Sequence, residues 1–119
     1  MFCKLLKAKL HHIRVTQAEK EYEGSLTLDE DLMDAVDIKN YEKILVANLD
    51  NGERFETYAI AGERGSGVCC LNGAAEYKGK IGDRLIIMIW CNLDEEEAKT
   101  HKPKIVRLDE NNKIVAAAI

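Results

Sequence analysis

The stretch KILVANLDNGERFETYAI, residues 43–60, places Asn51-Gly52 between two runs of β-prone residues. An Asn-Gly pair in this setting is the strongest short-range signal of a β-hairpin, because both residues accept the positive φ of a tight turn. Side chains alternate along a strand, so every second residue shares a face. One predicted face of the second strand carries Arg54, Glu56, Tyr58 and Ile60, and the other carries Phe55, Thr57 and Ala59.

The chain on both sides of this hairpin predicts further short strands and few helices. Strands are expected at 10–15, at 67–71 before a turn at Asn72-Gly73, at 83–93 as a fully buried strand, and as a terminal hairpin within 104–115 around Asn111-Asn112. Helical spacing in 28–36 predicts one short helix with Asp29 as its N-cap, and 94–100 predicts one more turn of helix. Many short strands with frequent turns favour a small barrel.

Length and composition indicate one ordinary globular domain. The chain has 119 residues, of which 46% are hydrophobic, and its net charge of −4 gives no general attraction to nucleic acid. The longest apolar run, LIIMIWC at 85–91, is too short to cross a bilayer. Lysines interrupt the apolar residues of the first segment, so no signal peptide is expected and a cytoplasmic location is predicted.

Four features have plain structural interpretations that compete with functional ones. The cysteines fit no zinc or redox spacing and are expected to be reduced, buried thiols. The adjacent His11 and His12 would be split between faces by a regular strand, so a metal site made of them alone is not expected. GERGSG at 62–67 lacks the Lys-Ser/Thr of a P-loop and favours a loop over phosphate binding. The acidic run 94–97 is expected to be a solvated helix start.

Arg54 and Tyr58 place two chemically useful side chains on one face of the predicted strand. A guanidinium suits a carboxylate, and a phenol can pass a proton. On their own, the two residues favour the plainer interpretation, a surface cross-strand pair.

Taken in order, several segments resemble the pyruvoyl-dependent aspartate 1-decarboxylase family over essentially the whole chain. They are KLHHIRVTQAEKEYEGS at 9–25, NGERFETYAIAGERGSG at 51–67, NGAAEYKGKIGD at 72–83 and DEEEAKTHKPKIV at 94–106. The resemblance implies a homotetramer of small, mostly β, six-stranded double-psi β-barrels with short helices and with active sites between subunits. It also implies that L-aspartate is decarboxylated to β-alanine and CO2 in pantothenate biosynthesis.

The resemblance implies that the single domain, residues 1–119, cuts itself between Gly24 and Ser25. The products would be a short chain, 1–24, and a long chain, 25–119, whose first residue becomes a covalent pyruvoyl group. Neither a metal nor pyridoxal phosphate would be needed. The ketone of the pyruvoyl group would form a Schiff base with the substrate amine and accept the electrons released with CO2.

Other site residues carry roles that the resemblance implies residue by residue. Tyr58 would be the proton donor, and Thr57 would assist self-cleavage and contact substrate. Substrate contacts are further expected from Lys9, Arg54, Asn72, Gly73, Ala74 and Ala75. Residues expected near the site are His11, Tyr22, Ile60 and Ile86. Thr57 and Tyr58 are adjacent, and a regular strand points neighbouring side chains to opposite faces. One regular strand should therefore not direct both of them into the same cavity.

Lys20, Leu26 and Gly62 depart from the family pattern. The sequence leaves open whether they alter the rate of self-cleavage and whether a maturation factor assists it. Two other functions stay in competition: a non-enzymatic barrel that binds a ligand or partner, and a pyruvoyl enzyme acting on another amino acid. Self-cleavage would distinguish the enzyme from the non-enzymatic barrel. The cationic pair Arg54 and Lys9 favours a diacid substrate over another amino acid.

Overall fold

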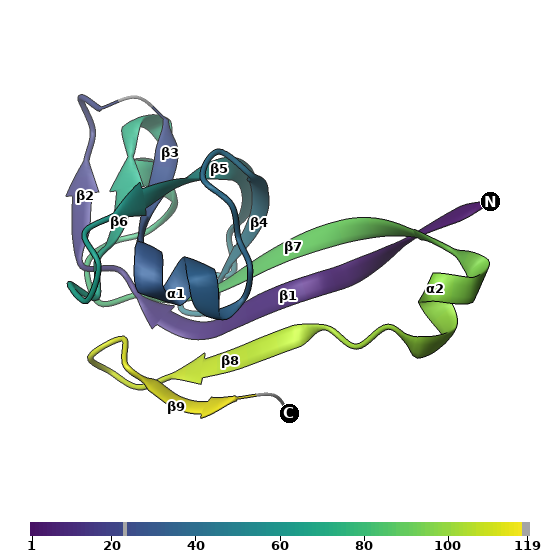
Figure 1. The fold of residues 1–119 in the computed structure, drawn as a ribbon. Helices are drawn as coiled ribbons and strands as arrows, with labels where there is room; N and C mark the ends of the chain where they lie inside the picture. The colour runs from purple at the N-terminus through teal and green to yellow at the C-terminus, as the bar shows by residue number, and fades with distance from the viewer. Residues whose placement is uncertain (23, 118–119) are drawn as a thin grey trace.

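The computed structural model describes residues 1–22 and 24–117 and shows that this part of the chain is mostly β with short helices, as predicted (Figure 1). Its strands are β1 (Phe2–Arg14), β2 (Gln17–Glu19), β3 (Ser25–Asp29), β4 (Lys43–Asn48), β5 (Arg54–Gly62), β6 (Cys69–Asn72), β7 (Arg84–Asp94), β8 (Lys104–Leu108) and β9 (Ile114–Ala117). The helices are α1 (Glu30–Ala35), α2 (Glu95–Thr100) and the 3-10 helix η1 (Gly73–Lys78).

The strands described in 1–22 and 24–117 pair in the order β2-β6-β3-β5-β4-β7-β1-β8-β9. The central run from β6 to β1 contains six strands, and β2, β8 and β9 extend it at its two ends. Parallel pairs (β3 with β5, β1 with β8, β2 with β6) are mixed with antiparallel ones. No pairing contradicts the predicted double-psi arrangement.

The predicted hairpin is confirmed. β4 pairs antiparallel with β5 from Lys43↔Tyr58 to Ala47↔Arg54, and Gly52 in the connection has a φ of 79°. The terminal hairpin is confirmed as well, because β8 and β9 pair antiparallel. Its turn residue Asn112 is buried and bonds Arg14 and the carbonyl of Gly67, which fastens the hairpin to the end of β1.

β1 and β7 form a long antiparallel pair that runs out from the rest of the molecule, with α2 at its far end (Figure 1). β1 is therefore much longer than the strand predicted at 10–15. The predicted helix start is confirmed: the Asp94 carboxylate accepts from the Glu97 amide, and the Glu97 carboxylate accepts from the Asp94 amide. This reciprocal capping begins the short helix in an exposed acidic segment.

The prediction of a fully buried strand at 83–93 is wrong. β7 alternates: Leu85, Ile87 and Ile89 are buried in the core, whereas Trp90 is 43% exposed. A continuous apolar run shows no alternation of apolar and polar residues. It therefore does not indicate whether one face of the strand is buried or both. The core itself comes from the inner faces of all the central strands and from Leu32, Met33 and Val36 at and just after α1.

The expected separation of His11 and His12 is also wrong. Pairing between β1 and β7 shifts register between His11 and Ile13, and His12 has a φ of 70°. This bulge breaks the strict alternation of faces. As a result, the two imidazole rings stack with centroids 3.9 Å apart.

Two of the cysteines match the expectation of buried free thiols. Cys69 and Cys70 are buried, but Cys91 is only half-buried and Cys3 is exposed at the outer end of β1. Within the described residues, no helix has the length and apolar character required to cross a membrane.

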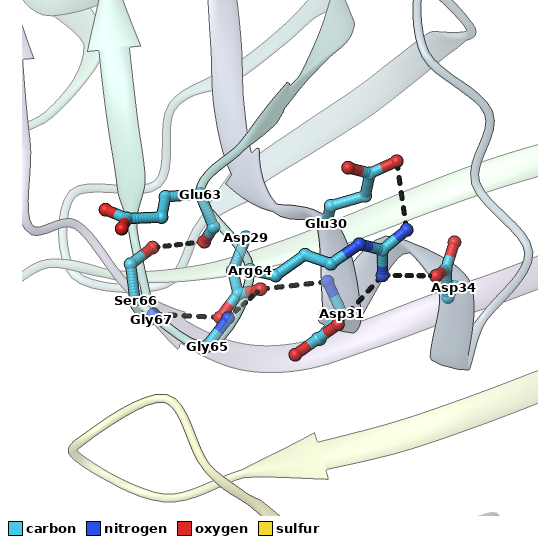
Figure 2. A network of polar contacts seen from close by, with 9 residues as sticks. All are labelled: Asp29, Glu30, Asp31, Asp34, Glu63, Arg64, Gly65, Ser66 and Gly67. Carbon is cyan, nitrogen blue, oxygen red and sulfur yellow. Dashed lines mark hydrogen bonds and ion pairs between the residues drawn. The ribbon is translucent and has the colours of Figure 1, made fainter.

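Asp29 organises the connection between β3, α1 and the loop 62–67, as Figure 2 shows. Its buried carboxylate accepts hydrogen bonds from the amides of Asp31 (2.8 Å), Gly65 (3.1 Å) and Gly67 (2.8 Å). The predicted N-cap is therefore confirmed, and the glycine-rich segment is a loop after Gly62, the last residue of β5. The amides of Gly65 and Gly67 bind the chain's own carboxylate and do not face a phosphate site.

We expect Asp29→Ala to destabilise the fold by about 2–4 kcal/mol, because three amides lose a charged acceptor and the helix loses its cap. Arg64→Ala is the matched control. Arg64 is half-exposed and pairs with Glu30, Asp31 and Asp34 at the surface, so its loss should cost no more than about 1 kcal/mol. Urea unfolding at one fixed protein concentration measures both. Equal midpoints for the two variants would contradict this ranking.

Candidate active site

Ser25 and Asn72 face each other across the antiparallel pair β3–β6. Both side chains are buried, and Asn72 Nδ2 donates to Ser25 Oγ at 2.9 Å and to Thr27 Oγ1 at 2.8 Å. The Asn72 carbonyl oxygen Oδ1 lies 3.2 Å from the thiol of Cys70. Ser25 thus begins β3 with its hydroxyl fixed from the neighbouring strand.

Gly73, directly after β6, is in close contact with the backbone of Tyr22 and Gly24. Gly73 has a φ of 59°, and a Cβ built there would lie 2.7 Å from the Tyr22 carbonyl oxygen and 2.8 Å from Gly24 Cα and N. Only glycine therefore fits without displacing the chain. The predicted turn at Asn72-Gly73 is the start of η1, which follows directly.

A pocket of about 210 Å³ opens beside Gly24. Four of its lining residues are predicted site residues, Gly24, Thr57, Ala74 and Ala75, and the others are Phe55, Glu56 and Lys78. The structure therefore brings Gly24, Thr57, Ala74 and Ala75 to one pocket.

β5 directs the side chains of Thr57 and Tyr58 to opposite faces, as strand alternation predicts. Thr57 pairs with the buried Ile44 and lines the pocket next to Gly24. The half-buried Tyr58 projects from the other face, where its ring lies 6.4 Å from that of Tyr41. β3 and β5 pair in parallel with Leu26 opposite Ala59, so the preceding residues Ser25 and Tyr58 lie level at the start of this pairing.

The remaining predicted residues form a second group on the outer face of the sheet. Register pairs Arg54 with Ala47, Ala47 with Ile86, and Ile86 with His11, so Arg54, Ile86 and His11 belong to one row across β5, β4, β7 and β1. Lys9 lies two residues before His11 on β1, opposite Met88. Within this group, Lys9, His11 and Ile86 lie on β1 and β7, which do not pair with the Ser25 strand β3, whereas Arg54 lies on β5, the neighbour of β3.

His11 is the electrostatically distinctive member of the second group. Burial is the largest of the effects that lower its pKa, and the charges of His12, Lys9 and Arg107 add to it. Its Nδ1 is buried and has no partner among the described residues. A neutral imidazole with an unused ring nitrogen is therefore held beside two cations. No cluster of three or more potential metal ligands occurs within 1–22 and 24–117.

Sequence reasoning missed Thr27 and Cys70, which share the hydrogen-bond cluster of Asn72. Strand alternation offered a signal for both, since Thr27 is two residues after Ser25 and Cys70 is two before Asn72. Tyr22 contributes its backbone to the contact with Gly73, while its side chain is exposed. Ile60 pairs with Thr27 next to the cluster.

The structure shows where the three residues that depart from the family pattern lie. Leu26 is a fully buried core residue, and Lys20 places its ammonium 5.1 Å from the ring centre of Tyr77. Gly62 is the one that borders the site, because a Cβ there would come within 2.8 Å of Thr27 Cγ2 and 2.6 Å of Val68 Cγ1.

Comparison with known proteins matches residues 1–115 to the family described as aspartate decarboxylase. The chain is 56% identical over 115 residues to the aspartate 1-decarboxylase of Caldicellulosiruptor saccharolyticus, covering 97% of this chain and 90% of that protein. It is 54% identical over 110 residues to the aspartate 1-decarboxylase of Clostridium kluyveri (92% and 87%). It is 53% identical over 115 residues to that of Shouchella clausii (97% and 91%).

The family resemblance implies self-cleavage between Gly24 and Ser25. We expect Gly73→Ala to slow this cleavage by about tenfold or more, because its Cβ would push against the backbone of Tyr22 and Gly24. Gly82→Ala is the matched control. Gly82 also has a positive φ, 95°, but no described atom lies within 4 Å of an added Cβ. Gel electrophoresis of freshly synthesised chains gives both rates. If the two variants cleave equally fast, the close contact at Gly73 does not position the scissile bond.

Proposed function

The chain belongs to the aspartate decarboxylase family, and we propose that it converts L-aspartate to β-alanine and CO2 after cutting itself between Gly24 and Ser25. The observation that carries the proposal is the buried Ser25 hydroxyl, held by Asn72 next to the Gly24 backbone. The expected setting is the cytoplasm, where the β-alanine would enter pantothenate biosynthesis. The free, buried thiols of Cys69 and Cys70 support that location.

Ser25 is a suitable precursor of a pyruvoyl group. Its Oγ is fixed by Asn72, and the adjacent carbonyl belongs to Gly24, beside a pocket in which an added Gly24 Cβ would meet no described atom within 4 Å. The pocket beside Gly24 therefore leaves space next to the bond that is cut. Once formed, the pyruvoyl group would supply an electrophilic ketone that accepts the electrons released with CO2.

The cleavage can be written from the chain's own atoms. Ser25 Oγ bonds to the Gly24 carbonyl carbon, the bond from that carbon to Ser25 N breaks, and the Oγ proton ends on the freed nitrogen. The resulting ester then loses the Ser25 Cα proton and expels Gly24 as a carboxylate. One water molecule is consumed as ammonia leaves, which produces the ketone. We assign Thr57, which lines the pocket with Gly24, to hold the developing oxyanion.

The outer-face group fits a dicarboxylate substrate. Arg54 offers a bidentate fork for one carboxylate, and Lys9 adds a second positive charge. Tyr58 lies level with Ser25, and its phenol is assigned as the proton donor to the carbon that loses CO2. Two cations favour aspartate over a monocarboxylic amino acid. Asn72, Gly73, Ala74 and Ala75 would line the other side of the substrate.

Lys9 lies on β1, which is not a neighbour of the Ser25 strand β3: β7, β4 and β5 stand between them in the order of the sheet. We therefore propose that each site lies between subunits of a homotetramer, where one chain supplies Ser25 and a neighbour supplies Lys9 and His11. The exposed hydrophobic side chains on the β1–β7 pair, such as Phe2 and Trp90, support burial against another subunit. The unpartnered Nδ1 of His11 is consistent with a contact made in the assembly.

Ser25→Ala tests the function directly. It removes the attacking hydroxyl, so we expect an uncut chain that makes no β-alanine from aspartate. Ser66→Ala is the control because Ser66 is exposed in the loop 62–67, and it should be cut and active. Chain cleavage is read on a denaturing gel, and β-alanine is quantified by chromatography. A Ser25→Ala chain that still makes β-alanine would refute the proposal. Wild-type protein that is cut but releases CO2 only from another amino acid would support the competing substrate.

Mixed assemblies test the position of the site. Ser25→Ala and Lys9→Ala should each be nearly inactive alone, since one lacks the reactive group and the other a substrate contact. Co-expressed in equal amounts, they should recover about a quarter of wild-type activity, because one site in four then combines the intact Ser25 of one chain with the intact Lys9 of another. If activity does not exceed that of the two variants measured separately, Lys9 does not act across the interface.

A further inference from the structure

The thiol of Cys70 is a buried polar group that the proposed mechanism leaves without a role. Cys70 lies on β6, two residues before Asn72, and its side chain is on the same face as Ser25, Thr27 and Asn72. It is 4% exposed, and its Sγ lies 3.2 Å from Asn72 Oδ1. The thiol therefore touches the residue that holds the Ser25 hydroxyl.

The thiol is the donor in this contact. Burial raises the pKa of Cys70, and the nearby carboxylate of Glu19 raises it further, so the sulfur keeps its proton at neutral pH. A protonated thiol donates, and of the two Asn72 amide groups only the oxygen can accept from it. The other acceptor in reach, the Leu71 carbonyl oxygen, is farther from the sulfur, at 4.0 Å against 3.2 Å. The amide nitrogen is then turned to the two hydroxyls, Ser25 Oγ and Thr27 Oγ1.

The opposite orientation of the Asn72 amide is the alternative that the thiol disfavours. With the amide turned over, Oδ1 would face the hydroxyls and Nδ2 would face sulfur, which is a weak acceptor. A buried amide N–H without a good acceptor is costly, whereas the observed orientation gives each group a matched partner. Two successive hydrogen bonds therefore run in one direction: the Cys70 thiol donates to Asn72 Oδ1, and Asn72 Nδ2 donates to Ser25 Oγ.

We propose that Cys70 is a positioning residue for self-cleavage: its thiol fixes the Asn72 amide so that Nδ2 holds Ser25 Oγ toward the Gly24 carbonyl. This inference rests on the proposed function, since it concerns the rate of the same cut. Cys70 touches neither of the reacting atoms and acts through Asn72. Small losses of alignment between a nucleophile and its target carbonyl slow a reaction strongly.

The neighbouring Cys69 supplies an internal comparison. It is fully buried in the core on the other face of β6, and its side chain makes no hydrogen bond within the described residues. Loss of either thiol removes a similar volume from the interior. Only loss of the Cys70 thiol removes the donor to Asn72.

The test compares cleavage rates of pulse-labelled chains made by cell-free synthesis, resolved on denaturing gels. Cys70→Ala should slow cleavage by about tenfold or more, and Cys70→Ser should stay within about threefold of wild type, because its hydroxyl restores a donor at the same place. Cys69→Ala should also stay within about threefold. Cys70→Val fills the volume without a donor and should be as slow as Cys70→Ala, which keeps the test decisive if the alanine variant folds poorly.

The outcomes separate the two proposals. If wild type is cut and Cys70→Val is cut equally fast, the role of Cys70 is refuted while the proposed function stands. Cys70→Ser that is as slow as Cys70→Val also refutes it, because a restored donor would then have no effect. A wild-type chain that is never cut refutes the proposed function and this inference with it. Slow Cys70→Val with fast Cys70→Ser and Cys69→Ala supports the positioning role.

Discussion

The hydrogen bond from Asn72 to Ser25 is the contact on which the rest of the site depends. It joins residues 47 positions apart in the sequence, and it forms because β3 and β6 pair with these two residues directly opposite each other. A one-residue slip of either strand would turn one of the side chains to the opposite face. The register of this pair therefore decides whether the Ser25 hydroxyl has a fixed position.

Other parts of the fold maintain that register. Asp29 ends β3 by capping α1 and binding the amides of Gly65 and Gly67, so β3 is anchored at the end opposite Ser25. Gly73 admits the backbone of Tyr22 and Gly24 at a distance that no side chain would tolerate. A buried network of this kind is stable only when each polar group has a partner, which is why a thiol next to Asn72 matters to the geometry.

Local features of the structure were largely predictable from the sequence. The Asn51-Gly52 hairpin and the Asp29 N-cap follow from residue preferences that act over a few positions, and both were confirmed. The bulge at His12 and the one-sided burial of β7 were not predicted, because they depend on how β1 and β7 pair over a long distance. No local pattern records such a pairing.

The candidate site likewise has residues that the sequence could identify and features that depend on strand pairing. The family resemblance supplied Ser25, Thr57 and Asn72, and the structure places Thr57 and Gly24 at one pocket. Alternation could have identified Thr27 and Cys70, but only after the pairing of β3 with β6 was known. The separation of Lys9 from Ser25 is a property of strand order, which appears in no single segment of the sequence.

An intact-mass measurement of the purified wild-type chain tests the central claim most directly. Self-cleavage at Gly24–Ser25 predicts two species in place of the single 13.4 kDa chain. One would have the mass of residues 1–24, and the other would be lighter than unmodified 25–119 by one ammonia molecule. A single species at the full mass in protein that makes β-alanine from aspartate would contradict the account.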